Sequence, residues 1–113
     1  MQNLRDVLKS EICKYVGNGI RANSRLFLML DDHHQLYAVN AVDEPRTDAA
    51  ATVVLMARIV GETIIIEEDQ TATKLAYVLM MRGIPPEQIK INYYDEDLLN
   101  DNRLKETQEF SGV

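Results

Sequence analysis

Cysteine is almost absent from this sequence, and Cys13 is its single representative. One cysteine excludes an intramolecular disulfide and a zinc site built from the cysteines of one chain. Long apolar runs are also missing, since 49–57 and 63–66 fall far short of the roughly 20 residues that a bilayer span needs. The chain does not start with a basic patch followed by an apolar stretch, as a secretory signal does. We therefore expect a cytoplasmic protein without a membrane span.

Sequence motifs for catalysis are lacking as well. The glycines at 17 and 19 are not followed by the Lys-Ser/Thr pair of a phosphate-binding loop. The sequence contains no Gly-x-Ser-x-Gly, and Cys13 has no histidine near it in sequence. We predict that the protein is not an enzyme and has no catalytic, cofactor-binding or metal-binding residues.

Basic residues are too few to balance the acidic ones. Lys and Arg number 12 against 18 Asp and Glu, which gives a net charge of -6. Duplex DNA binding draws most of its affinity from Lys and Arg, so autonomous DNA binding is disfavoured. A local basic patch remains an alternative, because net charge does not describe its distribution. The candidates for such a patch are Arg21, Arg25, Arg46 and Arg58.

The patterning that is present predicts one α+β domain over residues 1–113. Apolar residues at three- and four-residue spacing from Leu4 to Tyr15 predict an N-terminal helix, with Asn3 as N-cap and 17–19 as its end. Alternating or β-branched runs predict an antiparallel meander of about four strands. A helix and a final strand follow, and 95–113 form a loose acidic tail. The four meander strands are expected at 25–30, 35–42, 51–60 and 63–66.

Turn chemistry separates these elements. Gly61-Glu62 between two β-rich runs predicts a hairpin, and 43–48 predict an exposed loop. Thr71 is the expected N-cap of a helix over 72–82, with Gly83 at its C-terminal end. The final strand is expected at 89–93.

Two polar clusters are candidates for chemistry. Asp31-Asp32-His33-His34 has metal-ligand residue types, but adjacent side chains on an extended chain point apart and no other histidine exists. We therefore favour a solvated turn. Glu67-Glu68-Asp69 has the residue types of a general acid and base, but carboxylates before a helix are also favoured by its dipole. We favour this second role.

Residues 26–93 resemble the XisI family, whose motifs follow one another in the same order as these elements. The family is named for a cyanobacterial factor that controls excision of the fdxN DNA element. The resemblance rests on Val60-Gly61-Glu62, Ile64-Ile65-Ile66, Asp69-Gln70-Thr71, the turn Gly83-Ile84-Pro85 and the C-terminal Thr107 to Val113. The departures are Asn40-Ala41, where the family has Gly-Trp, Ile65, where it has Trp, and 95–105, which are longer and more acidic than in the family.

The resemblance implies a noncatalytic accessory role in DNA-element excision, a form of site-specific recombination, beside a nuclease-like protein of the XisH type. No catalytic residue carries over from the family. An acidic segment is attracted to a basic partner groove, so we predict that the partner binds at Asp95, Glu96, Asp97 and Asp101.

Three other interpretations stay open from the sequence alone. The protein is alternatively a direct DNA-binding regulator, or a small-molecule-binding or catalytic domain of unknown substrate. Strand edges and apolar residues such as Phe27, Met29 and Tyr37 are compatible with a homodimer or with a second core layer.

Overall fold

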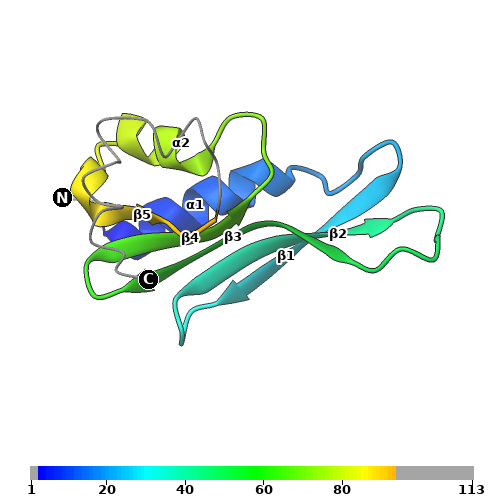
Figure 1. The fold of residues 1–113 in the computed structure, drawn as a ribbon, viewed down its shortest axis with the longest axis horizontal. Coiled ribbons are helices and arrows are strands. Elements are labelled where there is room, and N and C mark those ends of the chain that lie inside the picture. Colours follow the sequence, from blue (N-terminus) through cyan, green and yellow to red (C-terminus); the bar gives the residue numbers. More distant parts are fainter. Residues whose placement is uncertain (1–2, 94–113) are drawn as a thin grey trace.

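The computed structural model describes residues 3–93, which form one five-stranded sheet with two helices packed on it (Figure 1). In chain order the elements are α1 (Leu4–Val16), β1 (Ser24–Asp31), β2 (Leu36–Asp43), β3 (Thr52–Val60), β4 (Thr63–Asp69), α2 (Leu75–Met81), the 3-10 turn η1 (Pro86–Gln88) and β5 (Ile89–Ile91).

The four strands from β1 to β4 form the predicted antiparallel meander, each paired with the next. The hairpin at Gly61 is confirmed, because Val60 faces Thr63 across it and Gly61 has a φ of 62°. A positive φ is inexpensive only for glycine, which explains this residue at the tightest turn of the sheet. Residues 44–48 form an exposed loop, as expected, whereas Asp43 is the last residue of β2.

The last strand, β5, runs parallel to β4, and the chain between them passes through α2. The sheet is therefore mixed, with the order β1-β2-β3-β4-β5. A parallel neighbour needs a crossover connection, which α2 provides. The strand ends at Ile91, two residues earlier than expected, although Asn92 N still donates to Ile66 O at 2.9 Å.

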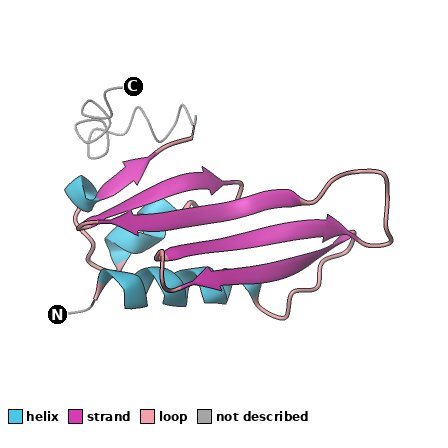
Figure 2. Cartoon of the chain, turned by 90° about the horizontal axis from the view of Figure 1, so that it is seen from below, coloured by secondary structure: helices cyan, strands magenta, loops and turns pink. Residues whose placement is uncertain are grey.

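Both helices lie on the same side of the sheet, which we call the helix face (Figure 2). Helix α1 contacts β1, β2 and β3, while α2 contacts α1 and β4. Buried apolar side chains from all these elements fill the space between them. The largest are Tyr37, Leu8, Ile12, Leu55, Ile64, Ile66, Leu79 and Ile89. Alternation along the strands directs the remaining side chains to the opposite, open face.

The start of α2 differs from the prediction. The helix begins at Leu75, three residues after the expected Ala72, and Thr71 is not its N-cap. Instead the carboxylate of Asp69 accepts a hydrogen bond from Leu75 N at 2.6 Å. Thr71 directly precedes the expected helix in the sequence, whereas the acceptor belongs to the last residue of β4. At the start of α1, Asn3 is the N-cap and accepts from Arg5 N at 2.8 Å, as predicted.

No helix among residues 3–93 is long and apolar enough to cross a bilayer. The residues of the predicted partner site, Asp95, Glu96, Asp97 and Asp101, lie outside the described range, as does the rest of the acidic 95–113 segment.

Candidate functional site

The polar residues of the β1–β2 turn bind one another and α1. Asp31 accepts from the backbone N–H of His34 at 3.1 Å, and the imidazole Nδ1 of His34 lies 2.7 Å from its other oxygen. These contacts hold the pKa of Asp31 below its ordinary value. Within residues 3–93 no three His, Cys, Asp or Glu side chains gather as metal ligands. The Asp31 carboxylate thus stabilises the turn through its contacts with His34.

Asp32 links this turn to the core. It accepts from Lys9 of α1 at 3.0 Å and from the phenol of Tyr37 at 2.9 Å. The hydrogen bonds from Lys9 and Tyr37 lower the pKa of Asp32. Tyr37 itself is fully buried, so it belongs to the core and not to an exposed surface. Burial, together with the nearby Asp32 carboxylate, raises the pKa of Tyr37 to about 12.

The acids at the end of β4 bind different groups of the chain. Glu67 binds Arg58 Nε at 2.7 Å and Asn92 Nδ2 at 2.6 Å. Burial opposes its ionisation, but these hydrogen bonds bring the pKa of Glu67 below its ordinary value. The ion pair also neutralises Arg58, one of the four arginines considered for a basic patch.

Asp69 is the most buried acid of the described chain, with 3% of its surface exposed. Its Oδ1 accepts from Thr71 N at 2.8 Å and lies 2.5 Å from the Thr71 hydroxyl, while its Oδ2 accepts from Leu75 N. Lys74 Nζ donates to the carbonyl of Asp69 at 3.0 Å. This carboxylate therefore joins the end of β4 to the start of α2, which agrees with the expected placement of acids before a helix.

Glu11 is a largely buried acid that no sequence motif singles out. Its side chain is 9% exposed and forms ion pairs with Lys14, at 2.9 Å, and with Arg82 at the end of α2. Burial disfavours the charge, but the two cationic donors lower the pKa of Glu11 overall. The ion pair between Glu11 and Arg82 connects the end of α2 to α1. No local pattern predicts it, because Glu11 and Arg82 are 71 residues apart.

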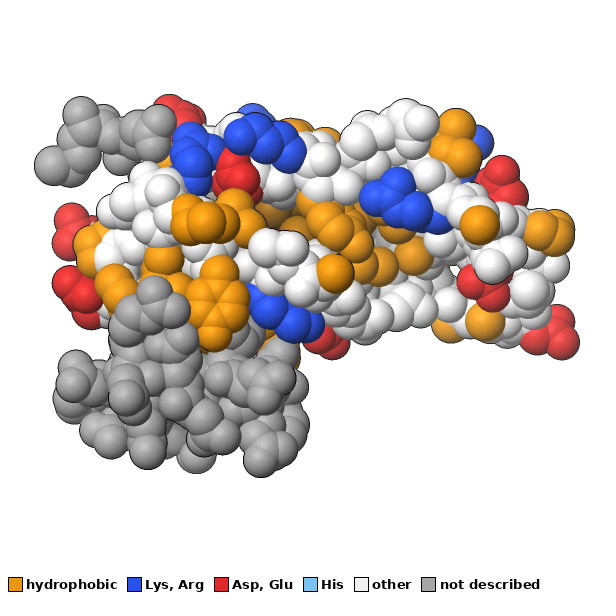
Figure 3. All heavy atoms as spheres, turned by 90° about the horizontal axis from the view of Figure 1, so that it is seen from above, with side chains coloured by type: hydrophobic (Ala, Val, Ile, Leu, Met, Phe, Trp, Pro, Cys, Tyr) orange, Lys and Arg blue, Asp and Glu red, His pale blue; other side chains and the backbone are white. Residues whose placement is uncertain are grey.

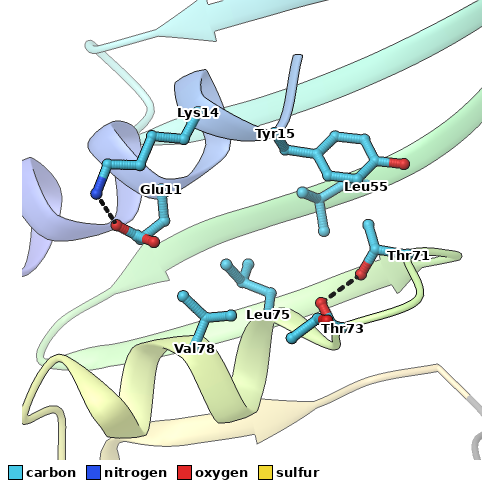
Figure 4. Close-up of a pocket in the computed structure, with 8 residues that line it drawn as sticks. All are labelled: Glu11, Lys14, Tyr15, Leu55, Thr71, Thr73, Leu75 and Val78. Atoms are coloured by element: carbon cyan, nitrogen blue, oxygen red, sulfur yellow. Dashed lines mark hydrogen bonds and ion pairs between the residues drawn. The ribbon is translucent and has the colours of Figure 1, made fainter. Parts of the chain in front are cut away.

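A groove runs between α1, α2 and β3 on the helix face. Figure 3 shows hydrophobic side chains along the middle of this face, with Lys and Arg side chains beside them. The groove has a volume of about 220 Å³. In Figure 4, Tyr15, Leu55 and Val78 approach it from three elements, and the Glu11–Lys14 pair lies at one end. Its lining is mainly apolar, and its carboxylate is already paired.

The main exposed apolar surface lies on β1. Phe27, Leu28, Met29 and Leu30 are exposed by 47%, 37%, 51% and 42%, which places four consecutive large apolar side chains in solvent. Only Leu26 of this strand joins the core. Alternation places Phe27 and Met29 on the open face and Leu28 and Leu30 on the helix face, so both faces of this edge strand expose apolar side chains. Grouped apolar side chains mark an interaction surface more often than a scattered apolar residue does. Phe27 and Met29 are two of the apolar residues that the sequence analysis considers for a homodimer, and Leu28 and Leu30 lie beside them on the strand.

Cys13 lies on α1 with intermediate exposure and is a free thiol. Of the other arginines considered for a basic patch, Arg21 donates to the carbonyls of Ile20 and Tyr15. Arg25 and Arg46 lie on β1 and in the 44–48 loop, both exposed. The basic side chains are thus distributed over several elements.

These features define a small α+β protein with helices on one side of a mixed sheet and an apolar strand at one edge. Two solved structures share this fold. A XisI-like protein from Anabaena variabilis has a TM-score of 0.68 and 19% identity over 80% of this chain and 84% of its own. The fdxN element excision controlling factor XisI of Anabaena variabilis has a TM-score of 0.65 and 21% identity over 82% of this chain and 91% of its own.

The sequence itself matches the family described as XisI protein over residues 1–103. The chain belongs to the XisI family. No curated protein sequence matches it.

Proposed function

We propose that this protein is a noncatalytic accessory factor that controls excision of a DNA element by binding a nuclease-like protein of the XisH type. The observation that carries the proposal is the family match over residues 1–103. One solved structure with the same fold is described as an fdxN element excision controlling factor, and the regulatory role that we propose follows this description.

Two properties of the chain support a role in protein contact. The described carboxylates with lowered pKa values, at Glu11, Asp31, Asp32 and Glu67, are each held by a neighbouring donor of the chain. These carboxylates are therefore engaged in contacts within the fold. The net charge of -6 favours a basic partner over a direct contact with nucleic acid.

The partner is tested by co-expressing the tagged chain with a nuclease-like protein of the XisH type and purifying the complex. We expect the two proteins to co-purify, with the affinity reduced by higher salt because opposite charges attract them. Repeated recovery of the chain alone would refute the proposal.

The acidic docking site is tested with the fourfold variant Asp95→Asn, Glu96→Gln, Asp97→Asn and Asp101→Asn. A second fourfold variant supplies the same charge change on exposed acids elsewhere, at Glu44→Gln, Asp48→Asn, Glu62→Gln and Glu87→Gln. We expect only the first to weaken the complex. Equal losses would assign the effect to net charge and not to this segment. A titration with DNA alone separates the remaining alternative, since steeply salt-dependent binding would favour a direct DNA binder.

A further inference from the structure

The outer edge of β1 is only partly covered by its own chain. Leu26 N donates to Gly19 O at 2.8 Å and Arg21 N donates to Ser24 O at 3.0 Å, so the 19–21 segment pairs with the first half of the strand. Main-chain groups alternate in direction along a strand. The N–H and C=O groups of Leu28 and Leu30 therefore point to the same outer side, beyond this short pairing.

Within residues 3–93 no other strand lies along this second half, since β1 pairs only with β2 in the sheet order. Natural edge strands are usually protected by proline, a bulge, a lysine or a very short length. Strand β1 has eight residues, a continuous register with β2, and no proline or lysine. Its charged residues, Arg25 and Asp31, lie toward its ends. The edge has the features of a pairing site.

We propose that β1 pairs antiparallel with β1 of a second copy of this chain, so that the two sheets continue into one. In this register Leu28 faces Leu30 of the second copy, and Met29 faces its own equivalent at the two-fold axis. Leu28 and Leu30 each contribute one N–H and one C=O to the new ladder. The 19–21 segment confines this pairing to the second half of the strand, because it occupies the edge at Ser24 and Leu26.

A second copy fits this edge because the edge is self-complementary. A two-fold axis makes apolar residues meet apolar residues at the centre of the joined sheet, as Leu28 with Leu30 on one face and Met29 with Met29 on the other. Beyond them Phe27 faces Asp31 of the second copy. The end charges have opposite signs. With Met29 at the axis, Arg25 of one copy lies diagonally across from Asp31 of the other on the open face, within reach of a long side chain.

The oligomeric state is tested by light scattering after size-exclusion chromatography of the full chain, over roughly a hundredfold range of concentration. We expect a mass of twice the 12.9 kDa of one chain at the upper concentrations. In the variant Met29→Lys, two like charges face each other at the axis, and we expect its dissociation constant to rise by at least about tenfold. A wild-type chain that stays monomeric throughout would overturn the proposal.

Val60→Lys is the matched control, because Val60 is 49% exposed at the end of β3 and receives the same charge change. We expect it to remain a dimer. Equal dissociation of both variants would contradict the β1 interface. Circular dichroism of both variants checks that each is folded.

A covalent test is independent of how well Met29→Lys folds. In the background Cys13→Ser, the variant Met29→Cys places two thiols in a directly opposed, non-hydrogen-bonded pair, with Cα atoms about 4.5 Å apart. This separation suits a disulfide. Mild oxidation should link Met29→Cys chains and leave Val60→Cys chains mostly unlinked. Equal linking at both positions would overturn the register.

Discussion

Removal of the Asp69 carboxylate is the most direct test of how the described sheet and α2 are joined. The variant Asp69→Ala removes the acceptor of three groups, which are Thr71 N, the Thr71 hydroxyl and Leu75 N. Loss of a helix-terminal acceptor costs about 1 kcal/mol. Loss of the charge-assisted contacts to Thr71, at a site where Asp69 is 3% exposed, adds about 2 kcal/mol.

We therefore expect Asp69→Ala to lower the free energy of unfolding by about 3 kcal/mol. For a chain of this size each kcal/mol changes the melting temperature by about 4 °C, so the expected drop is roughly 12 °C. Urea unfolding followed by circular dichroism gives the free energy. Asp69→Asn keeps one acceptor oxygen, and its loss should be about half as large.

The matched control is Asp48→Ala, which removes an exposed carboxylate from the loop before β3. Its effect should stay within about 0.5 kcal/mol. If Asp69→Ala lies within about 1 kcal/mol of this control, the carboxylate does not hold α2 in place and the reasoning fails.

Two further changes test other parts of the fold. The pKa of Tyr37 is raised from 10.0 to about 12, so the unfolded chain loses this phenol proton at a lower pH than the folded chain does. The contribution of the Tyr37 phenol to the free energy of unfolding is therefore full below about pH 10 and disappears as the pH rises toward 12. Urea midpoints at about pH 8 and about pH 11 should therefore differ less for Tyr37→Phe than for the wild type, and an equal difference would contradict the raised pKa. Gly83 follows α2 with a φ of 94°, and an added Cβ would meet no other atom. Gly83→Ala should therefore lower the free energy of unfolding by about 1–2 kcal/mol through backbone strain alone, and Gly83→Asn should lower it less. Thermal unfolding of the two variants checks this order, and an unchanged melting temperature for Gly83→Ala would refute it.

The sequence was informative where a pattern is local. The β-rich runs on either side of Gly61-Glu62 predicted two strands and their turn, because β-branched residues favour strands and glycine accepts a positive φ. Asn3 and Gly17 predicted the ends of α1, because a helix cap is formed by residues that are neighbours in sequence.

Features that depend on distant parts of the chain were not predicted. The start of α2 is set by Asp69, whose backbone belongs to β4, and the parallel direction of β5 depends on how α2 crosses the sheet. The ion pair of Glu11 with Arg82 joins residues 71 apart in sequence. Leu28 and Leu30 share the alternation of Leu26, but burial depends on which element covers each position, and only Leu26 joins the core.

The two edge strands of the described sheet differ in length, and the difference limits how far an assembly can grow. At one edge β5 has three residues, whereas β1 at the other has eight. Head-to-tail joining of unlike edges repeats without end and builds a filament. Pairing of β1 with β1 consumes the long edge of both copies and leaves the short β5 outermost on each side. Growth by that route is self-terminating, so the exposed apolar strand leads to a closed pair and not to a fibre.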